Sequence, residues 1–145
     1  LIFNLVVNAC DAMPSGGSLI IETANITLHE ECTALYPEVQ PGEYVLLTIH
    51  DTGHGISDEI KDKIFDPFFT TKNKDHSGLG LAVVLGIVKQ HGGQIQVQSK
   101  VGIGSTFRVY LPRMAKPAAL PNLLKGNTVI SNMIQQKLAG YEKKL

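Results

Sequence analysis

The sequence has no tryptophan, only two cysteines and few aromatic residues, which make up 6% of its 145 residues. Any core that it forms must therefore be mostly aliphatic. Cys10 and Cys32 form neither a C-x-x-C pair nor a spacing that suits a metal, which favours a reducing compartment and predicts a cytoplasmic protein. No apolar run approaches the roughly 20 residues of a membrane span, so we expect no direct membrane contact by this part. The chain begins with neither Met nor a signal peptide, and we expect it to be a piece of a longer protein.

Neither sign of charge is in excess, because 13 basic and 13 acidic residues cancel. The missing basic excess argues against nucleic acid as a partner. With 43% hydrophobic residues the chain can bury a core, and its length corresponds to about one domain. The charges are unevenly spread, since residues 114–145 carry five Lys and one Glu after a more acidic stretch. This shift predicts one domain over residues 1–112 and a basic linker or tail, helical in part, over residues 113–145.

Hydrophobic periodicity predicts an alternation of helices and strands. Spacings of three and four residues indicate a helix over residues 2–13, which Pro14 and the glycines after it end. Ser57 is a good N-cap for a short helix, and Gly92 is a left-handed C-cap for a longer one. The order of the expected helices and strands along the chain predicts an α/β (α+β) two-layer sandwich with a mixed β-sheet and helices on one face. The other expected elements are a helix over residues 79–91 and strands over residues 18–26, 43–51, 94–99 and 106–111.

Three glycine clusters lie at the ends of these elements. Asp-Thr-Gly-His-Gly-Ile at residues 51–56 places a carboxylate at a strand end, beside a backbone with few side chains. Gly-Leu-Gly-Leu at residues 78–81 opens a helix, where free backbone N–H groups attract phosphate. Gly102 and Gly104 fall in a hairpin turn. Each cluster alone could be an ordinary tight turn, and the P-loop, dinucleotide and protein-kinase signatures are missing from the sequence.

The opening helix carries polar side chains on one face, because Asn4, Asn8 and Asp11 are spaced i, i+4 and i+7. Carboxamide oxygens suit a cation that prefers oxygen ligands. Mg²⁺ is the best match, since it takes few protein ligands beside substrate phosphates. The alternative interpretation is a solvated helix face.

Five segments with distinctive residues follow one another along the chain. They are an asparagine-bearing helix at residues 4–12, a glycine cluster at residues 51–56, a phenylalanine-rich run at residues 64–72, and glycine clusters at residues 78–82 and 102–107. Together they resemble the ATP-binding catalytic domain of sensor histidine kinases, within the superfamily shared with type II topoisomerases, heat-shock chaperones and mismatch-repair ATPases. The resemblance covers residues 1–112 and implies a Bergerat-type ATP-binding fold, here with its first strand cut off.

The resemblance implies ATP and Mg²⁺ as cofactors. It implies that Asp51 accepts a hydrogen bond from the adenine amino group and that Gly53 lets the base approach the backbone. It assigns Mg²⁺ to Asn8, with Asn4 supporting the phosphates, so these two asparagines are the catalytic candidates. The turn at residues 78–81 would cradle the phosphates. The implied nucleotide-binding residues are Asn8, Asp51, Gly53, Gly55, Ile56, Phe65, Lys72, Gly78, Leu79, Gly80, Leu81 and Thr106.

The resemblance also implies a function. The γ-phosphate of ATP would move to a histidine on a separate dimerisation domain of the same parent kinase, with a response regulator as the downstream partner. None of the five histidines has the His-Glu/Asp-x-x-x-Pro context of the family's acceptor, and His76 stands where the family's lid usually has glycine. Two alternatives remain open: an anti-sigma-type serine protein kinase of the same fold, which typically lacks the Phe-Phe-Thr-Thr-Lys run, and a non-catalytic nucleotide-sensing domain.

Overall fold

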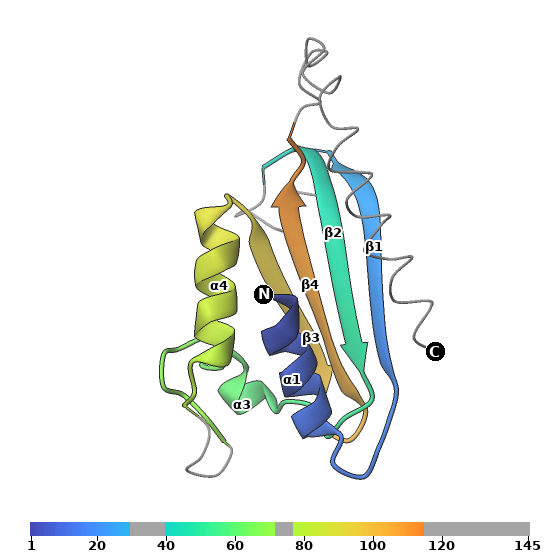
Figure 1. Cartoon of the computed structure of the whole chain (residues 1–145), viewed down its shortest axis with the longest axis vertical. Helices are drawn as coiled ribbons and strands as arrows, with labels where there is room; N and C mark the ends of the chain where they lie inside the picture. The colour runs from blue at the N-terminus through green and yellow to red at the C-terminus, as the bar shows by residue number, and fades with distance from the viewer. Residues whose placement is uncertain (30–39, 72–76, 115–145) are drawn as a thin grey trace, which may run out of the picture. The chain divides into compact units, whose positions relative to one another are not determined.

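The computed structural model describes residues 1–29, 40–71 and 77–114 (Figure 1). Residues Leu1–Arg113 form one compact unit. The tail that the sequence predicts begins at its boundary and lies almost wholly outside the described residues. The elements are the helices α1 (Ile2–Ala12), α3 (Asp58–Lys61) and α4 (Gly80–Gln90) and the strands β1 (Leu19–Leu28), β2 (Gly42–Asp51), β3 (Gln94–Lys100) and β4 (Gly104–Pro112).

The described strands form one sheet in the order β1-β2-β4-β3, and every neighbouring pair is antiparallel. The sheet is therefore antiparallel rather than mixed. β2 and β3, which are joined through α3 and α4, do run in the same direction, because both are antiparallel to β4. They are not neighbours, since β4 lies between them and pairs with each. The expected two-layer α/β architecture is confirmed.

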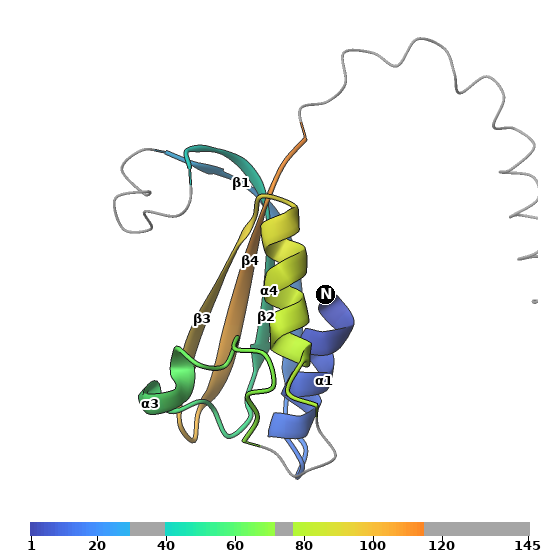
Figure 2. The same ribbon diagram turned by 90° about the vertical axis from the view of Figure 1, so that its left-hand side faces the viewer.

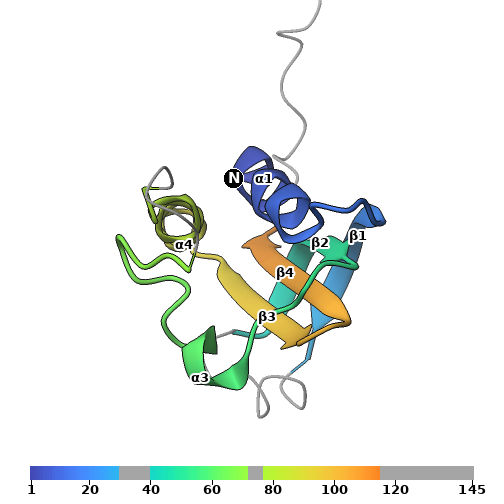
Figure 3. The same cartoon turned by 90° about the horizontal axis from the view of Figure 1, so that it is seen from below.

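Helices α1 and α4 cover one face of the sheet, as the views in Figure 2 and Figure 3 show. Both helices are amphipathic, and fully burying one aliphatic side chain contributes about 1.5–3 kcal/mol. In the described part of the chain, no helix combines the length and the apolar character of a membrane-spanning segment. The buried core beneath the helices consists of Leu5, Leu47, Ile49, Ile64, Val84, Val88, Ile95, Phe107 and Val109.

Strand alternation divides the side chains of β2 and β4 between the two faces of the sheet. Odd-numbered residues such as Ile49 and Phe107 belong to the core beneath the helices. Even-numbered residues point to the other face, where Tyr44 and Tyr110 form a small second apolar cluster. This alternation decides which residues at the strand ends can reach a site on the helix side.

The helix ends agree with the sequence, with one difference. Gly92, just beyond α4, has a φ of 65°, the left-handed conformation that was predicted for the cap. Ser57 is the N-cap residue of α3, as expected, but its side chain makes no capping hydrogen bond. An ion pair between Lys61 and Asp58 joins the two ends of α3 instead. The hydrogen bond and the positive charge of Lys61 lower the pKa of Asp58 below its usual value.

Two glycines let distant segments touch at one end of the sheet. Gly104 has a φ of 135°, and a Cβ there would lie 2.0 Å from the carbonyl oxygen of Asp51. Gly55 has a φ of 73°, and a Cβ there would lie 2.2 Å from the carbonyl oxygen of Lys100. Both positions therefore exclude a side chain, and both also have a backbone conformation that L residues avoid.

We predict that Gly104→Ala lowers the free energy of unfolding by at least about 2 kcal/mol, because backbone strain and a steric clash add together. Gly102→Ala should cost about 1 kcal/mol, since its φ is 76° but no atom lies within 4 Å of the added Cβ. Gly86→Ala is the matched control in α4, where open space and helix propensity should give a gain of about 0.5–1 kcal/mol. Urea unfolding of the whole chain measures all three, and equal losses at Gly104 and Gly102 would contradict the close packing.

Candidate functional site

One end of the sheet gathers the segments that the sequence singled out. β2 and α1 end there, α4 begins there, and the β3–β4 turn lies beside them (Figure 1). These segments surround a pocket of about 290 Å³. Of the site residues predicted from the sequence, those that line the pocket are Asn4, Asn8, Asp51, Gly55, Ile56, Gly78, Gly80 and Leu81.

Asp51 supplies a carboxylate that is only 2% exposed, at the last position of β2. Its Oδ1 accepts a hydrogen bond from the backbone N–H of Gly53 at 2.9 Å and another from the backbone N–H of Ser105 at 3.3 Å. Within the described residues, no fully buried side-chain oxygen or nitrogen lacks a partner. Because both bonds use Oδ1 and Asp51 lines the pocket, Oδ2 is the oxygen available to a ligand there.

Ser105 is the β4 residue that lines this pocket. The resemblance implied Thr106 as a nucleotide-binding residue, and the structure corrects this expectation. Ser105 is buried, lies opposite Asp51 in the strand register and lines the pocket. Thr106 is the next residue and therefore points to the other face of the sheet. Its Oγ1 lies there, 2.9 Å from Nδ1 of His50, its own partner in the register.

Gly53 and Gly55 shape the loop after β2 for different reasons. Gly53 is packed against α1, since a Cβ there would lie 2.6 Å from the Cβ of Ala12, and it does not line the pocket. Gly53 therefore allows the loop to lie close to the end of α1, rather than allowing a base to approach the backbone as the resemblance implies. Gly55 lines the pocket and contacts the β3–β4 turn behind it.

Asn4 and Asn8 of α1 line the pocket next to the start of α4. Nδ2 of Asn4 donates a 3.1 Å hydrogen bond to the carbonyl oxygen of Gly80 and so connects the two helices. Asn8 lies close to the same residue, because a Cβ built on Gly80 would be 3.8 Å from Nδ2 of Asn8. The structure thus brings both asparagines and the second glycine cluster together.

The segment between α3 and α4 contributes Phe69 to the pocket rather than Phe65. Phe65 packs against the core, whereas Phe69 both packs there and lines the pocket. Leu79 is 36% exposed and does not line the pocket. Lys72, the remaining predicted residue, lies outside the described residues.

Several pocket residues were not predicted from the sequence. Val7, Ile64 and Phe107 contribute apolar surface, and His54 is exposed beside the glycine loop. Periodicity was the available signal, since Val7 lies three residues after Asn4 on the helix and Phe107 shares the strand face of Ser105. Apolar walls with a few converging polar groups are typical of small-molecule sites.

The donor groups of the pocket fit Mg²⁺. Among the residues that the structure describes, no three His, Cys, Asp or Glu side chains cluster as a self-contained metal site would need. Asn8 and Asp11 place an amide and a carboxylate in the pocket wall. Mg²⁺ commonly binds one or two protein oxygens together with substrate phosphates, so this sparse set of oxygen donors suits it.

Comparisons with known proteins agree on one family. Residues 1–115 match the family described as histidine kinase-, DNA gyrase B-, and HSP90-like ATPase. The sensor kinase CckA of Brucella abortus (strain 2308) is 46% identical over 112 residues, which are 77% of this chain and 12% of that protein. The chain therefore spans about an eighth of the length of that relative.

The same fold occurs in solved structures, including the following two. The mycobacterial sensor histidine kinase MprB has a TM-score of 0.58 at 29% identity, over 75% of this chain and 65% of that one. Full-length ShkA in complex with AMPPNP has a TM-score of 0.55 at 25% identity, over 75% of this chain and 20% of that one.

We predict that Asp51→Ala destabilises the domain far more than Asp51→Asn. Alanine leaves the N–H groups of Gly53 and Ser105 without an acceptor, and each buried unpaired group costs about 1–3 kcal/mol. We therefore expect a loss of about 2–5 kcal/mol for alanine. Asparagine keeps an amide oxygen for both donors and should lose less than about 2 kcal/mol. Urea unfolding measures the difference, and equal losses would show that the carboxylate does not hold the two backbones.

Proposed function

The chain belongs to the histidine kinase-, DNA gyrase B- and HSP90-like ATPase family, and on this premise we propose that it is the ATP-binding catalytic domain of a sensor histidine kinase. The observation that supports this most is the pocket that joins the Asp51 carboxylate to the start of α4. It combines an acceptor for a base with a helix N-terminus for phosphate. The neighbouring structure of ShkA, which contains AMPPNP, is consistent with an adenine nucleotide as the ligand.

Base recognition is assigned to Asp51. With Oδ1 held by two backbone amides, Oδ2 accepts a hydrogen bond from the exocyclic amine of adenine. Guanine carries a carbonyl at that place, so two acceptors would face each other and the buried carboxylate would lack a donor. The apolar side chains of Val7 and Phe107 give the base a dry surface to pack on.

Phosphate binding is assigned to the start of α4. Gly78 and Gly80 keep side chains away from its first N–H groups, which attract phosphate oxygens together with the helix dipole. Asn4 holds this turn against α1. Asn8 is proposed as the Mg²⁺ ligand, and the ion would neutralise charge on the phosphates when bound. Positioning and charge stabilisation are most of what phosphoryl transfer requires.

The acceptor histidine is proposed to come from a separate dimerisation domain of the same parent kinase, with a response regulator as the downstream partner. Nδ1 lies within hydrogen-bond distance of an oxygen of this domain in His50, His54 and His91. His54 lines the pocket, and its Nδ1 donates to the Gly55 carbonyl at 2.7 Å, because a carbonyl can only accept.

A cytoplasmic location, and no contact of this domain with nucleic acid or membrane, remain predictions.

We predict that Asp51→Asn weakens Mg·ATP binding about 10- to 100-fold, because a charge-assisted hydrogen bond is lost. The asparagine oxygen is needed by the two backbone amides, so its NH₂ group faces the pocket and opposes the adenine amine. The preference for ATP over GTP should therefore shrink as well. Calorimetric titration of the whole chain with each nucleotide measures both effects.

Thr106→Val is the matched control for this experiment, because Thr106 lies on the other face of the sheet. It should change the affinity for Mg·ATP by less than about twofold, well below the effect of losing one hydrogen bond to a charged group. Equal affinity of the unsubstituted chain for ATP and GTP would overturn the assignment of Asp51.

We also predict that the chain does not label itself with the γ-phosphate of ATP. Transfer needs an acceptor nitrogen about 3–3.5 Å from the phosphorus and in line with the departing oxygen. Incubation with γ-labelled ATP and Mg²⁺, followed by an acid-lability test, measures this. Acid-labile label that His54→Gln removes would contradict the proposal, since the acceptor would then belong to this domain.

A further inference from the structure

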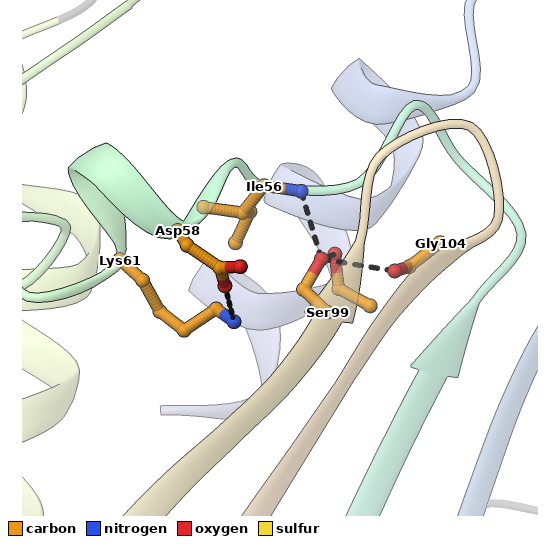
Figure 4. A network of polar contacts seen from close by, with 6 residues as sticks. Ile56, Asp58, Lys61, Ser99 and Gly104 are labelled. Carbon is orange, nitrogen blue, oxygen red and sulfur yellow. Dashed lines mark hydrogen bonds and ion pairs between the residues drawn. The ribbon is translucent and has the colours of Figure 1, made fainter.

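Ser99 lies in β3 directly opposite Ser105 of β4, and it does not line the pocket. Its hydroxyl nevertheless stands at the centre of a polar network, which Figure 4 shows and which includes residues that line the pocket. Oγ of Ser99 lies 2.8 Å from the backbone nitrogen of Ile56, 2.9 Å from the carbonyl oxygen of Gly104 and 3.0 Å from Oγ of Ser105. One side chain thus joins the loop after β2 to the start of β4, and two of its partners, Ile56 and Ser105, line the pocket.

The direction of each bond follows from what the groups can do. A serine hydroxyl has one proton to donate and two lone pairs to accept with. The Gly104 carbonyl can only accept, so the proton of Ser99 goes there. The Ile56 N–H can only donate, so it uses one lone pair of Ser99. The second lone pair is left for Ser105, and the hydroxyl of Ser105 must be the donor.

This arrangement decides what Ser105 presents to a ligand. Its proton points back to Ser99, so only lone pairs of its Oγ face the pocket that it lines. Its backbone N–H is also committed, because it donates to Oδ1 of Asp51. Ser105 Oγ and Asp51 Oδ2 therefore form a pair of acceptors. Two acceptors suit an exocyclic amine, which carries two donor hydrogens, and repel a carbonyl oxygen.

We propose that Ser99 is a positioning residue for base selection, which fixes the Ser105 hydroxyl as a hydrogen-bond acceptor toward the bound base. This proposal rests on the proposed function, because it requires that an adenine nucleotide occupy the pocket. Without the Ser99 hydroxyl, the Ser105 proton is free to rotate into the pocket. Ser105 then becomes a donor that tolerates a carbonyl oxygen on the base.

The test compares the binding of Mg·ATP and Mg·ITP by calorimetry on the whole chain. Inosine has a carbonyl where adenine has its amine and lacks the extra amino group of guanine, so it probes this position directly. We expect the unsubstituted chain to prefer ATP. Ser99→Ala should reduce that preference about 3- to 10-fold, the range that one neutral hydrogen bond supports. Ser99→Thr keeps the hydroxyl and should restore the preference to within about twofold.

A double-mutant cycle separates positioning from support of the fold. If Ser99 acts through Ser105, then Ser99→Ala should leave the ATP-to-ITP preference unchanged in a Ser105→Ala background. An equal loss of affinity for both nucleotides in Ser99→Ala would overturn the proposal, since Ser99 would then support the pocket without affecting the preference for ATP over ITP. The same change of preference with and without Ser105 would also overturn it.

The proposed function and this inference fail in different ways. Failure of the unsubstituted chain to bind either nucleotide would refute the nucleotide site itself. Binding with a preference that Ser99 does not influence would refute only the role of Ser99. If Ser99→Ala does not fold, Ser99→Cys gives the same comparison, because a thiol is a weak acceptor for the Ser105 proton, and the same reduction of the preference is expected.

Discussion

A single buried carboxylate connects the fold of this domain to its pocket. The N–H groups of Gly53 and Ser105 meet at Oδ1 of Asp51, although they come from a loop and from a strand far along the chain. Both can reach the same oxygen only when β2 and β4 pair in the observed register and the chain turns sharply after β2. This sharp turn requires glycine, because Ala12 leaves no room for a Cβ at Gly53. The register of the sheet, the packing of α1 and the shape of the pocket therefore depend on one another.

The sequence predicted the elements of the described residues closely, because apolar spacing is a local property. Every boundary that was expected for the two longer helices and the strands lies within two residues of the observed one. The neighbours of each strand were not predicted as well, because the sequence indicated a mixed sheet and the observed one is antiparallel. Strand pairing is not local, and a helix between β2 and β3 is compatible with direct parallel pairing or with a strand inserted between them. The insertion of β4 is what makes the sheet antiparallel.

The sequence predicted the chemical types at the site better than the directions of the side chains. Asp51 was predictable as a charged residue that ends an apolar strand, and it does reach the pocket. Thr106 was expected from its place in a motif, but the buried Phe107 beside it already assigns Thr106 to the opposite face. The contact of Gly53 with Ala12 had no local signal, because it joins a loop to a helix about forty residues away.

The two ends of the pocket differ in how firmly they are held. At the Asp51 end, disruption would expose the carboxylate and leave two backbone amides unpaired. At the end near Gly78, the N–H of Phe68 donates to the Gly78 carbonyl at 3.1 Å, while Phe68 has a φ of 68° and is 74% exposed. A bulky residue in that conformation stores about 1–3 kcal/mol of strain, and its exposed ring recovers little of it by burial. Rearrangement therefore costs less at the Gly78 end than at the Asp51 end. That asymmetry matches the proposed function, in which the contacts with the base persist while the contacts with the phosphates change.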